Sequence, residues 1–307
     1  MPTIDEIIEY LTRRKEKILA EDFENVEKKK MLEISVEEKY KQELSSRKIK
    51  TGTLLDDLIG GGLEPKSRLL LYGEYGSGKT QTCFTIAVLC PDHVIYIDTE
   101  GSFKATRIKQ ICDARGIDYK AVFKKIHLFQ PKSWIEQMLI LDRLPSPADI
   151  EDGKIGLIIL DSLSKHFRGI EFAGRQSLSI KQPLIRECIG RLERIADAYN
   201  CALILTTQIY ESPTANPFLP EWTGQRAVGG ASLEHQPDYV VFLRKAQGNV
   251  RIARLMDASW QPQRERPFMI TEKGIEDLPE TKKAEKIIKK TEKFEKQFYE
   301  MEKEKES

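Results

Sequence analysis

The sequence predicts an α/β fold: a mainly parallel β-sheet flanked by helices, followed by an antiparallel extension, with helical appendages at both ends. Three observations predict it. Short apolar runs alternate with helical patterns through the middle of the chain, which is typical of a parallel sheet covered on both faces. Nearer the C-terminus, two apolar runs are separated by only a few polar residues, which indicates a hairpin. Both ends are rich in charge.

The expected parallel strands are short apolar runs, each bounded by polar or turn residues. They are RLLLY (68–72), HVIYID (93–98), IHLF (126–129), GLIILD (156–161) and ALILTT (202–207). The helical patterns between these strands cover 79–90, 103–115, 133–144 and 181–199. The antiparallel extension is expected from DYVVFLRK (238–245), VRIARLMD (250–257) and PFMIT (267–271).

Changes in composition set the predicted domain boundaries. We expect a charged helical N-terminal arm over 1–48, the α/β core over 49–279, and a charged helical or disordered tail over 280–307. The arm opens with a Thr-x-x-Glu capping box at Thr3 and Glu6, which predicts an amphipathic helix. The arm therefore looks like a packing element, because its acids and bases alternate.

Overall composition excludes several classes of protein. With a net charge of +1, the molecule as a whole does not attract nucleic acid, so any nucleic-acid-binding surface must be a local patch. The five cysteines show no metal-ligand spacing and are typical of a reducing compartment. The acidic start is wrong for a signal peptide, and no apolar run approaches the ~20 residues of a membrane helix. These features predict a cytoplasmic protein that does not contact a membrane.

The stretch GEYGSGKTQT, at 73–82, satisfies the phosphate-loop pattern G-x-x-x-x-G-K-T between an expected strand and an expected helix. Its glycines let backbone N–H groups surround phosphates, and the helix N-terminus adds partial positive charge. The alternative is a simple turn between strand and helix. The predicted nucleotide-binding residues here are Gly73, Glu74, Tyr75, Gly76, Ser77, Gly78, Lys79, Thr80 and Gln81. Lys79 would bridge the β- and γ-phosphates and Thr80 would bind Mg²⁺, so ATP and Mg²⁺ are the expected cofactors.

Polar residues at three further strand ends are candidates for the same site, because the carboxyl ends of parallel strands meet at one edge of the sheet. Asp161 follows four apolar residues and suits a Mg²⁺ position; its alternative role is the N-cap of a following helix. Glu100 and Gln208 are the candidates for activating or orienting water in ATP hydrolysis.

These strand ends, in this order, resemble the RecA-type recombinases, and most closely the archaeal RadA family. The resemblance covers 49–278. Six segments carry it: KTGTLLDDLIGGGLE (50–64), GEYGSGKTQ (73–81), YIDTEGSFKATRIKQICDARGID (96–118), LIILDSLSKHFRGIEFAGRQSL (157–178), AVGGASLEH (227–235) and GNVRIARLMDA (248–258).

The resemblance implies a RecA-type P-loop ATPase core with particular roles for matching residues. Lys79 and Glu100 would be catalytic, with Glu100 activating the attacking water. Arg107 would pack on the adenine. Gln208, also catalytic, would sense the γ-phosphate and link it to a DNA-binding loop. The family's sheet order would place the strand before Gln208 between the phosphate-loop strand and the Asp161 strand.

The chain also departs from the family's strand-exchange enzymes. Each departure affects either an appended domain or a segment that helps protomers to assemble. The 48 N-terminal residues, a segment rich in charge, lack the Gly-rich hairpins of a helix–hairpin–helix domain. No Phe-x-x-Ala segment lies between Met31 and Lys50. The family's GGH is Gly229-Gly230-Ala231 here, and its Asp-x-Pro cap is Asp257-Ala258-Ser259. The chain therefore resembles a RadC-type paralog of RadA.

Two segments are candidate DNA-binding loops. The first, 164–181, combines Lys165, Arg168 and Arg175 with aromatic residues, which suits a single-stranded backbone; the alternative is a solvated loop. The second, 209–228, carries aromatic residues but Arg226 is its only base. Base stacking and docking on a partner protein are equally compatible with the second loop.

Three functions are compatible with these features. The favoured function is an ATP-dependent, single-stranded-DNA-binding accessory of homologous recombination and DNA repair, with slow, DNA-influenced ATPase activity. The second is a filament-forming strand-exchange recombinase, and the third a RecA-fold signalling or scaffold ATPase that does not bind DNA. A recombinase or another paralog is the possible protein partner, and monomer or oligomer is left open.

Overall fold

The computed structural model describes residues 13, 35–45, 47–53, 55–150, 153–168, 176–211, 225–227, 237–258 and 261–279. The chain divides into two compact units, residues 1–46 and 47–307. In the first unit, helix α2 (Val36–Ser45) carries the solvent-exposed ion pair Lys41–Glu37 at i,i+4 spacing, with a distance of 2.7 Å. The helix expected at the start of the chain lies outside the described residues, except that Arg13 is helical.

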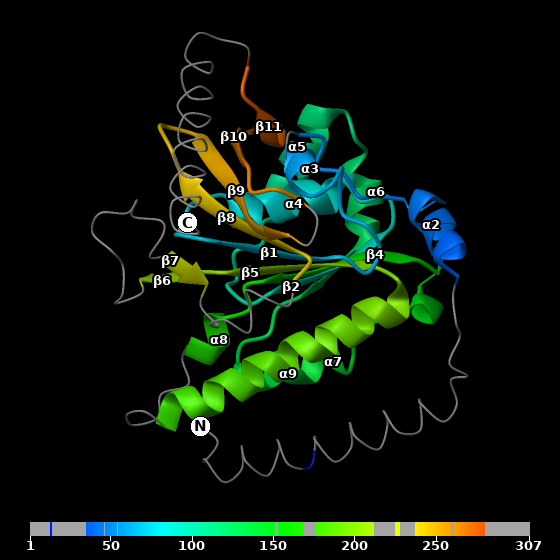
Figure 1. Cartoon of the computed structure of the whole chain (residues 1–307), viewed down its shortest axis with the longest axis vertical. Helices are drawn as coiled ribbons and strands as arrows, with labels where there is room; N and C mark the ends of the chain where they lie inside the picture. Colours follow the sequence, from blue (N-terminus) through cyan, green and yellow to red (C-terminus); the bar gives the residue numbers. More distant parts are fainter. Residues whose placement is uncertain are drawn as a thin grey trace, which may run out of the picture. The chain divides into compact units, whose positions relative to one another are not determined.

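The second unit is built on a nine-stranded sheet with the order β11-β10-β9-β8-β1-β5-β4-β2-β3 (Figure 1). Its strands are β1 (Arg68–Gly73), β2 (His93–Asp98), β3 (Ile126–Phe129), β4 (Ile155–Asp161), β5 (Ala202–Thr207), β8 (Tyr239–Lys245), β9 (Val250–Ala258), β10 (Glu265–Thr271) and β11 (Gly274–Asp277). The six strands from β8 to β3 run parallel. Strands β9, β10 and β11 continue the sheet antiparallel. The expected mainly parallel sheet with an antiparallel extension is confirmed.

Helices cover both faces of this sheet (Figure 1). On one face lie α3 (Leu55–Leu58), α4 (Lys79–Leu89), α5 (Ala105–Arg115) and α6 (Tyr119–Lys125). On the other lie α7 (Trp134–Leu141), α8 (Lys165–Arg168) and α9 (Gln176–Tyr199). A short 3₁₀ turn, Pro147–Asp149, precedes β4, and a separate two-stranded sheet pairs β6 (Ile209–Glu211) with β7 (Gln225–Ala227).

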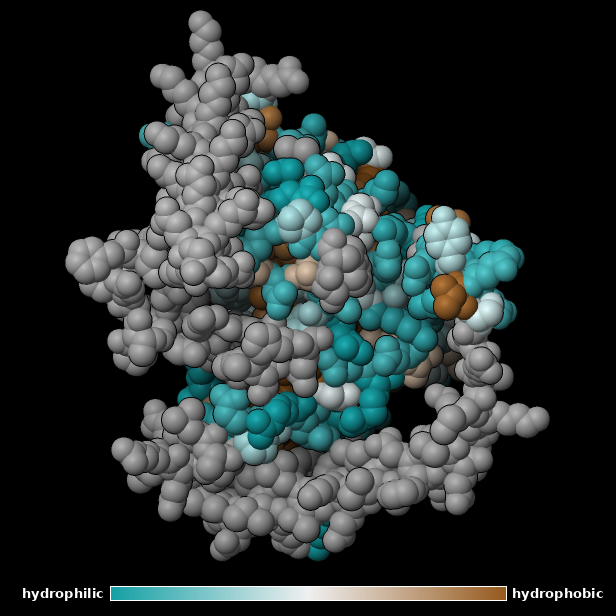
Figure 2. All heavy atoms as spheres, in the orientation of Figure 1, coloured by the Kyte–Doolittle hydropathy of each residue, from teal (hydrophilic) through white to brown (hydrophobic). Residues whose placement is uncertain are grey.

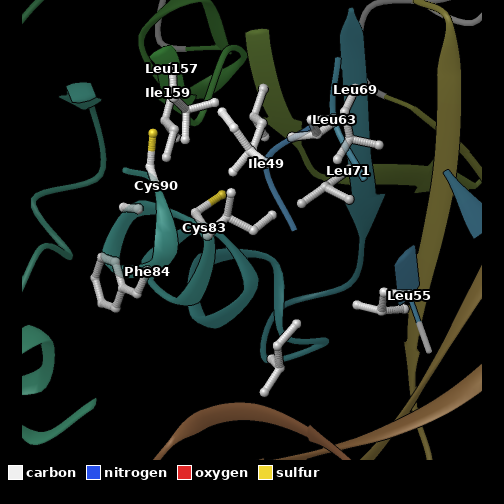
Figure 3. Packing of buried hydrophobic residues seen from close by; sticks show 14 of the residues in the cluster. Ile49, Leu55, Leu63, Leu69, Leu71, Cys83, Phe84, Cys90, Leu157 and Ile159 are labelled. Atoms are coloured by element: carbon white, nitrogen blue, oxygen red, sulfur yellow. The ribbon is translucent and has the colours of Figure 1, made fainter. Parts of the chain in front are cut away.

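The central strands are apolar at almost every position because both faces of the sheet are buried. In β1, Leu69 and Leu71 pack into the core under α4, while Leu70 between them points to the opposite face and is also fully buried. Leu69 and Leu71 belong to the same buried cluster as Cys83 and Phe84 of α4, and Figure 3 labels all four side chains. Burying each large apolar side chain stabilises the fold by ~1.5–3 kcal/mol. This packing holds α4 on the sheet, so that the helix begins beside the carboxyl end of β1.

The surface of the described residues is mainly hydrophilic on the face shown in Figure 2. All five cysteines are free and buried, as expected for small apolar side chains. Among the helices that the structure describes, none combines the length and the apolar character that crossing a membrane requires.

Candidate active site

The phosphate loop connects the end of β1 to the start of α4 and depends on glycine for its shape. Gly73, Gly76 and Gly78 all have positive φ. A Cβ on Gly73 would lie 2.0 Å from the backbone oxygen of Leu243 on β8. The loop therefore emerges from the sheet through a gap that no side chain can occupy.

We expect Gly73→Ala to destabilise the fold much more than Gly116→Ala. Both glycines have positive φ, but a Cβ on Gly116 meets no atom within 4 Å. The clash at Gly73 is with backbone, which cannot swing aside, so the difference should be ~2 kcal/mol. For a chain of this size, that corresponds to roughly 5 °C in melting temperature. Equal melting temperatures for the two variants would show that β8 moves away at little cost.

Lys79 lies at the start of α4 with its ammonium group inside the loop. Its Nζ donates to the backbone oxygens of Gly73, at 2.8 Å, and Glu74, at 2.9 Å. Burial lowers the pKa of Lys79, and the nearby carboxylates of Asp161 and Glu100 oppose that shift. A cation held by two carbonyl groups at a helix N-terminus can exchange these neutral acceptors for phosphate oxygens, which bind it more strongly.

Ser77 in the phosphate loop has a buried hydroxyl group that is available to a polar ligand. Its hydroxyl oxygen is buried and has no hydrogen-bond partner among the described residues. Buried polar groups without a partner are rare in folded proteins and require an explanation. A phosphate in the loop would supply the missing acceptor, so the residues present fit a nucleotide.

Asp161 ends β4 and accepts three hydrogen bonds from hydroxyl groups. Thr80 on α4 donates to it at 2.8 Å, Tyr96 on β2 at 3.0 Å and Thr206 on β5 at 2.6 Å. Burial raises the pKa of Asp161, and these hydrogen bonds oppose the rise. The Thr80 hydroxyl and the Asp161 carboxylate thus place two oxygen atoms next to each other beside the phosphate loop. Oxygen atoms are the ligands that Mg²⁺ prefers.

Glu100 meets two other strand-end residues at the same edge of the sheet. The Ser162 hydroxyl, just past β4, donates to Glu100 Oε1 at 2.9 Å. The Gln208 amide, just past β5, donates to the same oxygen at 3.3 Å. Strand β5 lies between β1 and β4, as the resemblance implied, and this order brings Gln208 beside Glu100.

Arg107 ties α5 to α4 and to the turn after β10. Its Nε donates to the side-chain oxygen of Gln81 at 2.8 Å, and Nη2 donates to the backbone oxygen of Thr271. Burial lowers the pKa of Arg107, and Glu272 opposes this. Arg107, which the resemblance predicts to pack on the adenine, is therefore held by a hydrogen bond to α4, the helix that follows the phosphate loop.

A comparison with protein families matches residues 42–278 to the family described as Rad51. The chain belongs to the Rad51 family. It is 36% identical over 280 residues to the DNA repair and recombination protein RadA of Aeropyrum pernix, and the alignment covers 88% of this chain and 84% of that protein. It is 38% identical over 248 residues to the protein of the same name from Metallosphaera sedula, covering 77% and 74%. The RecA-type resemblance is confirmed.

Only part of the expected DNA-binding set of this Rad51-family chain lies within the described residues. Lys165 and Arg168 lie on α8 and are exposed. Arg175 lies outside the described residues, and Arg226 lies in β7 with its side chain outside the description. The segments Gly229-Gly230-Ala231 and 280–307, and Ser259, are outside it as well.

Several residues at the site were not predicted from the sequence. Tyr96 and Thr206 hold Asp161, and Ser162 holds Glu100. On the hairpin β8–β9, Arg251 Nε donates to the Gly76 backbone oxygen at 2.8 Å, and Lys245 Nζ lies 3.7 Å from the Glu74 carboxylate. For Thr206, Ser162, Lys245 and Arg251, the available signal was a position at or close to a strand end, whereas Tyr96 lies inside β2 and gave no such signal.

Proposed function

We propose that this chain is an ATP-dependent, single-stranded-DNA-binding protein that hydrolyses ATP slowly and acts as an accessory RadA paralog in homologous recombination and DNA repair. One observation carries the ATPase part. A loop cation, Lys79, the oxygen pair Thr80–Asp161 and a hydrogen-bonded carboxylate, Glu100, converge at one edge of the sheet. The names of the two relatives, DNA repair and recombination proteins, support the biological process.

The proposed roles follow from the chemistry of each group. Lys79 would exchange its two carbonyl partners for phosphate oxygens, and Ser77 and the loop N–H groups would surround them. Thr80 and Asp161 would hold Mg²⁺, which when bound neutralises charge on the phosphates. Glu100 would accept a proton from water, with Ser162 and Gln208 fixing its orientation.

DNA binding is proposed for the basic residues of the first loop. Lys165 and Arg168 are exposed on α8, and Arg175 follows in the sequence. A bound strand would be held mainly through its phosphates, so affinity should fall as salt rises. Arg226 in the second loop is a further candidate contact.

The test is the double variant Arg168→Ala with Arg175→Ala. Binding of a fluorescent single-stranded oligonucleotide should weaken, and the slope of log affinity against log salt should fall by ~1.4, about 0.7 for each lost phosphate contact. ATP affinity should stay unchanged. The matched control is Arg143→Ala with Arg186→Ala. It removes the same charge from two exposed positions, one in the turn after α7 and one on α9. If both double variants bind DNA like the unmodified chain, the DNA site lies in the second loop or the N-terminal arm.

A filament-forming strand-exchange recombinase is the second candidate, and the extent of the similarity to RadA favours it. Against it stand the missing Phe-x-x-Ala segment and the Asp257-Ala258-Ser259 sequence, which lacks the rigid proline. Losing an interface anchor typically costs ~2 kcal/mol or more, and a filament repeats that loss at every joint. We therefore expect monomers or short oligomers. Long ATP-dependent filaments on DNA in electron micrographs, with unaided strand exchange, would make the second candidate correct.

A further inference from the structure

Arg168 is connected to the candidate catalytic carboxylate by two consecutive hydrogen bonds. Its Nη1 donates to Gln208 Oε1 at 2.7 Å. The Gln208 Nε2 in turn donates to Glu100 Oε1 at 3.3 Å. A residue of the first loop thus reaches the water-activating group of the site through one amide.

The orientation of the Gln208 amide follows from its two neighbours. A guanidinium group can only donate hydrogen bonds and an ionised carboxylate can only accept them. The amide oxygen must therefore face Arg168 and the amide nitrogen must face Glu100. Without Arg168, the amide could turn over or leave Glu100, because the backbone of Gln208 does not determine its side-chain orientation.

The surroundings of Arg168 hold its backbone in place while its charged end stays exposed. The neighbouring Phe167 is buried, and the Arg168 N–H donates to the Ser164 oxygen at 3.0 Å. Lys181 on α9 donates to the Arg168 oxygen at 3.4 Å. Nε and Nη2 of the guanidinium make no hydrogen bond within the described part of the chain, so they can bind an anion while Nη1 remains on Gln208.

At Glu100 both donors use the same oxygen. Ser162 and Gln208 donate to Oε1, and no donor among the described residues reaches Oε2. Two hydrogen bonds to one oxygen fix the carboxylate plane and leave the other oxygen for water. The hydrogen bond from Gln208 is longer than the one from Ser162 and therefore weaker. It should be lost more easily when Arg168 no longer orients the Gln208 amide.

We propose that Arg168 is a positioning residue for ATP hydrolysis, acting through Gln208 on Glu100, in addition to any contact with DNA. The inference rests on the proposed ATPase function. It gives the first loop a physical route to the catalytic carboxylate, because an anion bound by Nε and Nη2 of Arg168 would act on the same guanidinium group that holds Gln208.

The test is a double-mutant cycle on DNA-free ATP hydrolysis by the full chain. Arg168→Ala should lower kcat about five-fold, the rate equivalent of losing one ordinary hydrogen bond, and leave KM for ATP unchanged. In the Gln208→Ala background, Arg168→Ala should have no further effect. Arg168→Lys, which keeps a donor and the charge, should recover part of kcat. Arg186→Ala removes an exposed charge from α9 and should leave kcat unchanged.

Three results would overturn the inference: an equal loss of kcat from Arg168→Ala in both backgrounds, a rise in KM with kcat unchanged, or no recovery with Arg168→Lys. An unmodified chain that shows no ATP turnover, with or without DNA, would instead overturn the proposed function and this inference with it. The two failures are distinguishable, because the second appears before any residue is changed.

Discussion

Lys79→Ala is expected to abolish productive ATP binding. The substitution removes the cation that lies inside the phosphate loop and leaves the oxygens of Gly73 and Glu74 without their donor. Because the group is buried, its interaction with phosphate is not screened by water, and kcat/KM should fall by a factor of ~100–1,000, as for removal of other preorganised donors. Phosphate release measures turnover, and the gain in melting temperature on adding ATP and Mg²⁺ measures binding.

The matched control is Lys120→Ala, which removes an exposed lysine from α6. It should leave both the turnover and the ATP-induced rise in melting temperature unchanged. If Lys79→Ala keeps the ATP affinity and rate of the unmodified chain, the glycine-rich loop is only a turn between β1 and α4.

Glu100→Gln should separate ATP binding from hydrolysis. The amide has nearly the same shape as the carboxylate, and its oxygen can still accept from Ser162 and Gln208. It cannot take a proton from water, so kcat should fall by ~100-fold or more while the ATP-induced stabilisation remains. Single-turnover hydrolysis and thermal denaturation with ATP measure the two properties separately.

Hydrolysis that persists in Glu100→Gln near the original rate would make Glu100 structural. Asp98 is a poor substitute as the base, since it is buried and accepts from the N–H groups of Ser102 and Phe103 and from Gln130. Those contacts indicate that Asp98 caps the turn before α5. Glu38→Gln, an exposed change on α2, controls for the loss of one negative charge.

The strands and the phosphate loop could be predicted because their signals are local. Strands β1, β2, β4 and β5 are buried on both faces, so the sequence has no polar interruption until each strand ends. The polar residue at that end then marks the ligand edge of the sheet. The same reasoning predicts from the sequence that Asp161, Glu100 and Gln208 lie at one edge of the sheet.

Other features depend on contacts that no local pattern encodes. Helix α6 was not predicted because it is only seven residues long. Helix α9 begins five residues before the predicted start and contains Pro183, which favours a boundary rather than an interior position. Arg251 reaches Gly76 across 175 residues of sequence, and such pairing emerges only when β8 and β1 are adjacent.

We propose above all that ATP in the phosphate loop controls the binding of single-stranded DNA. The most direct test is the affinity for a fluorescent oligonucleotide at fixed salt, measured with ATP and Mg²⁺, with ADP and Mg²⁺, and without nucleotide. We expect ATP to tighten binding about ten-fold, within the usual range of coupling between two sites. Lys79→Ala should bind DNA with the nucleotide-free affinity under all three conditions. Equal affinity of the unmodified chain with and without ATP would contradict the account.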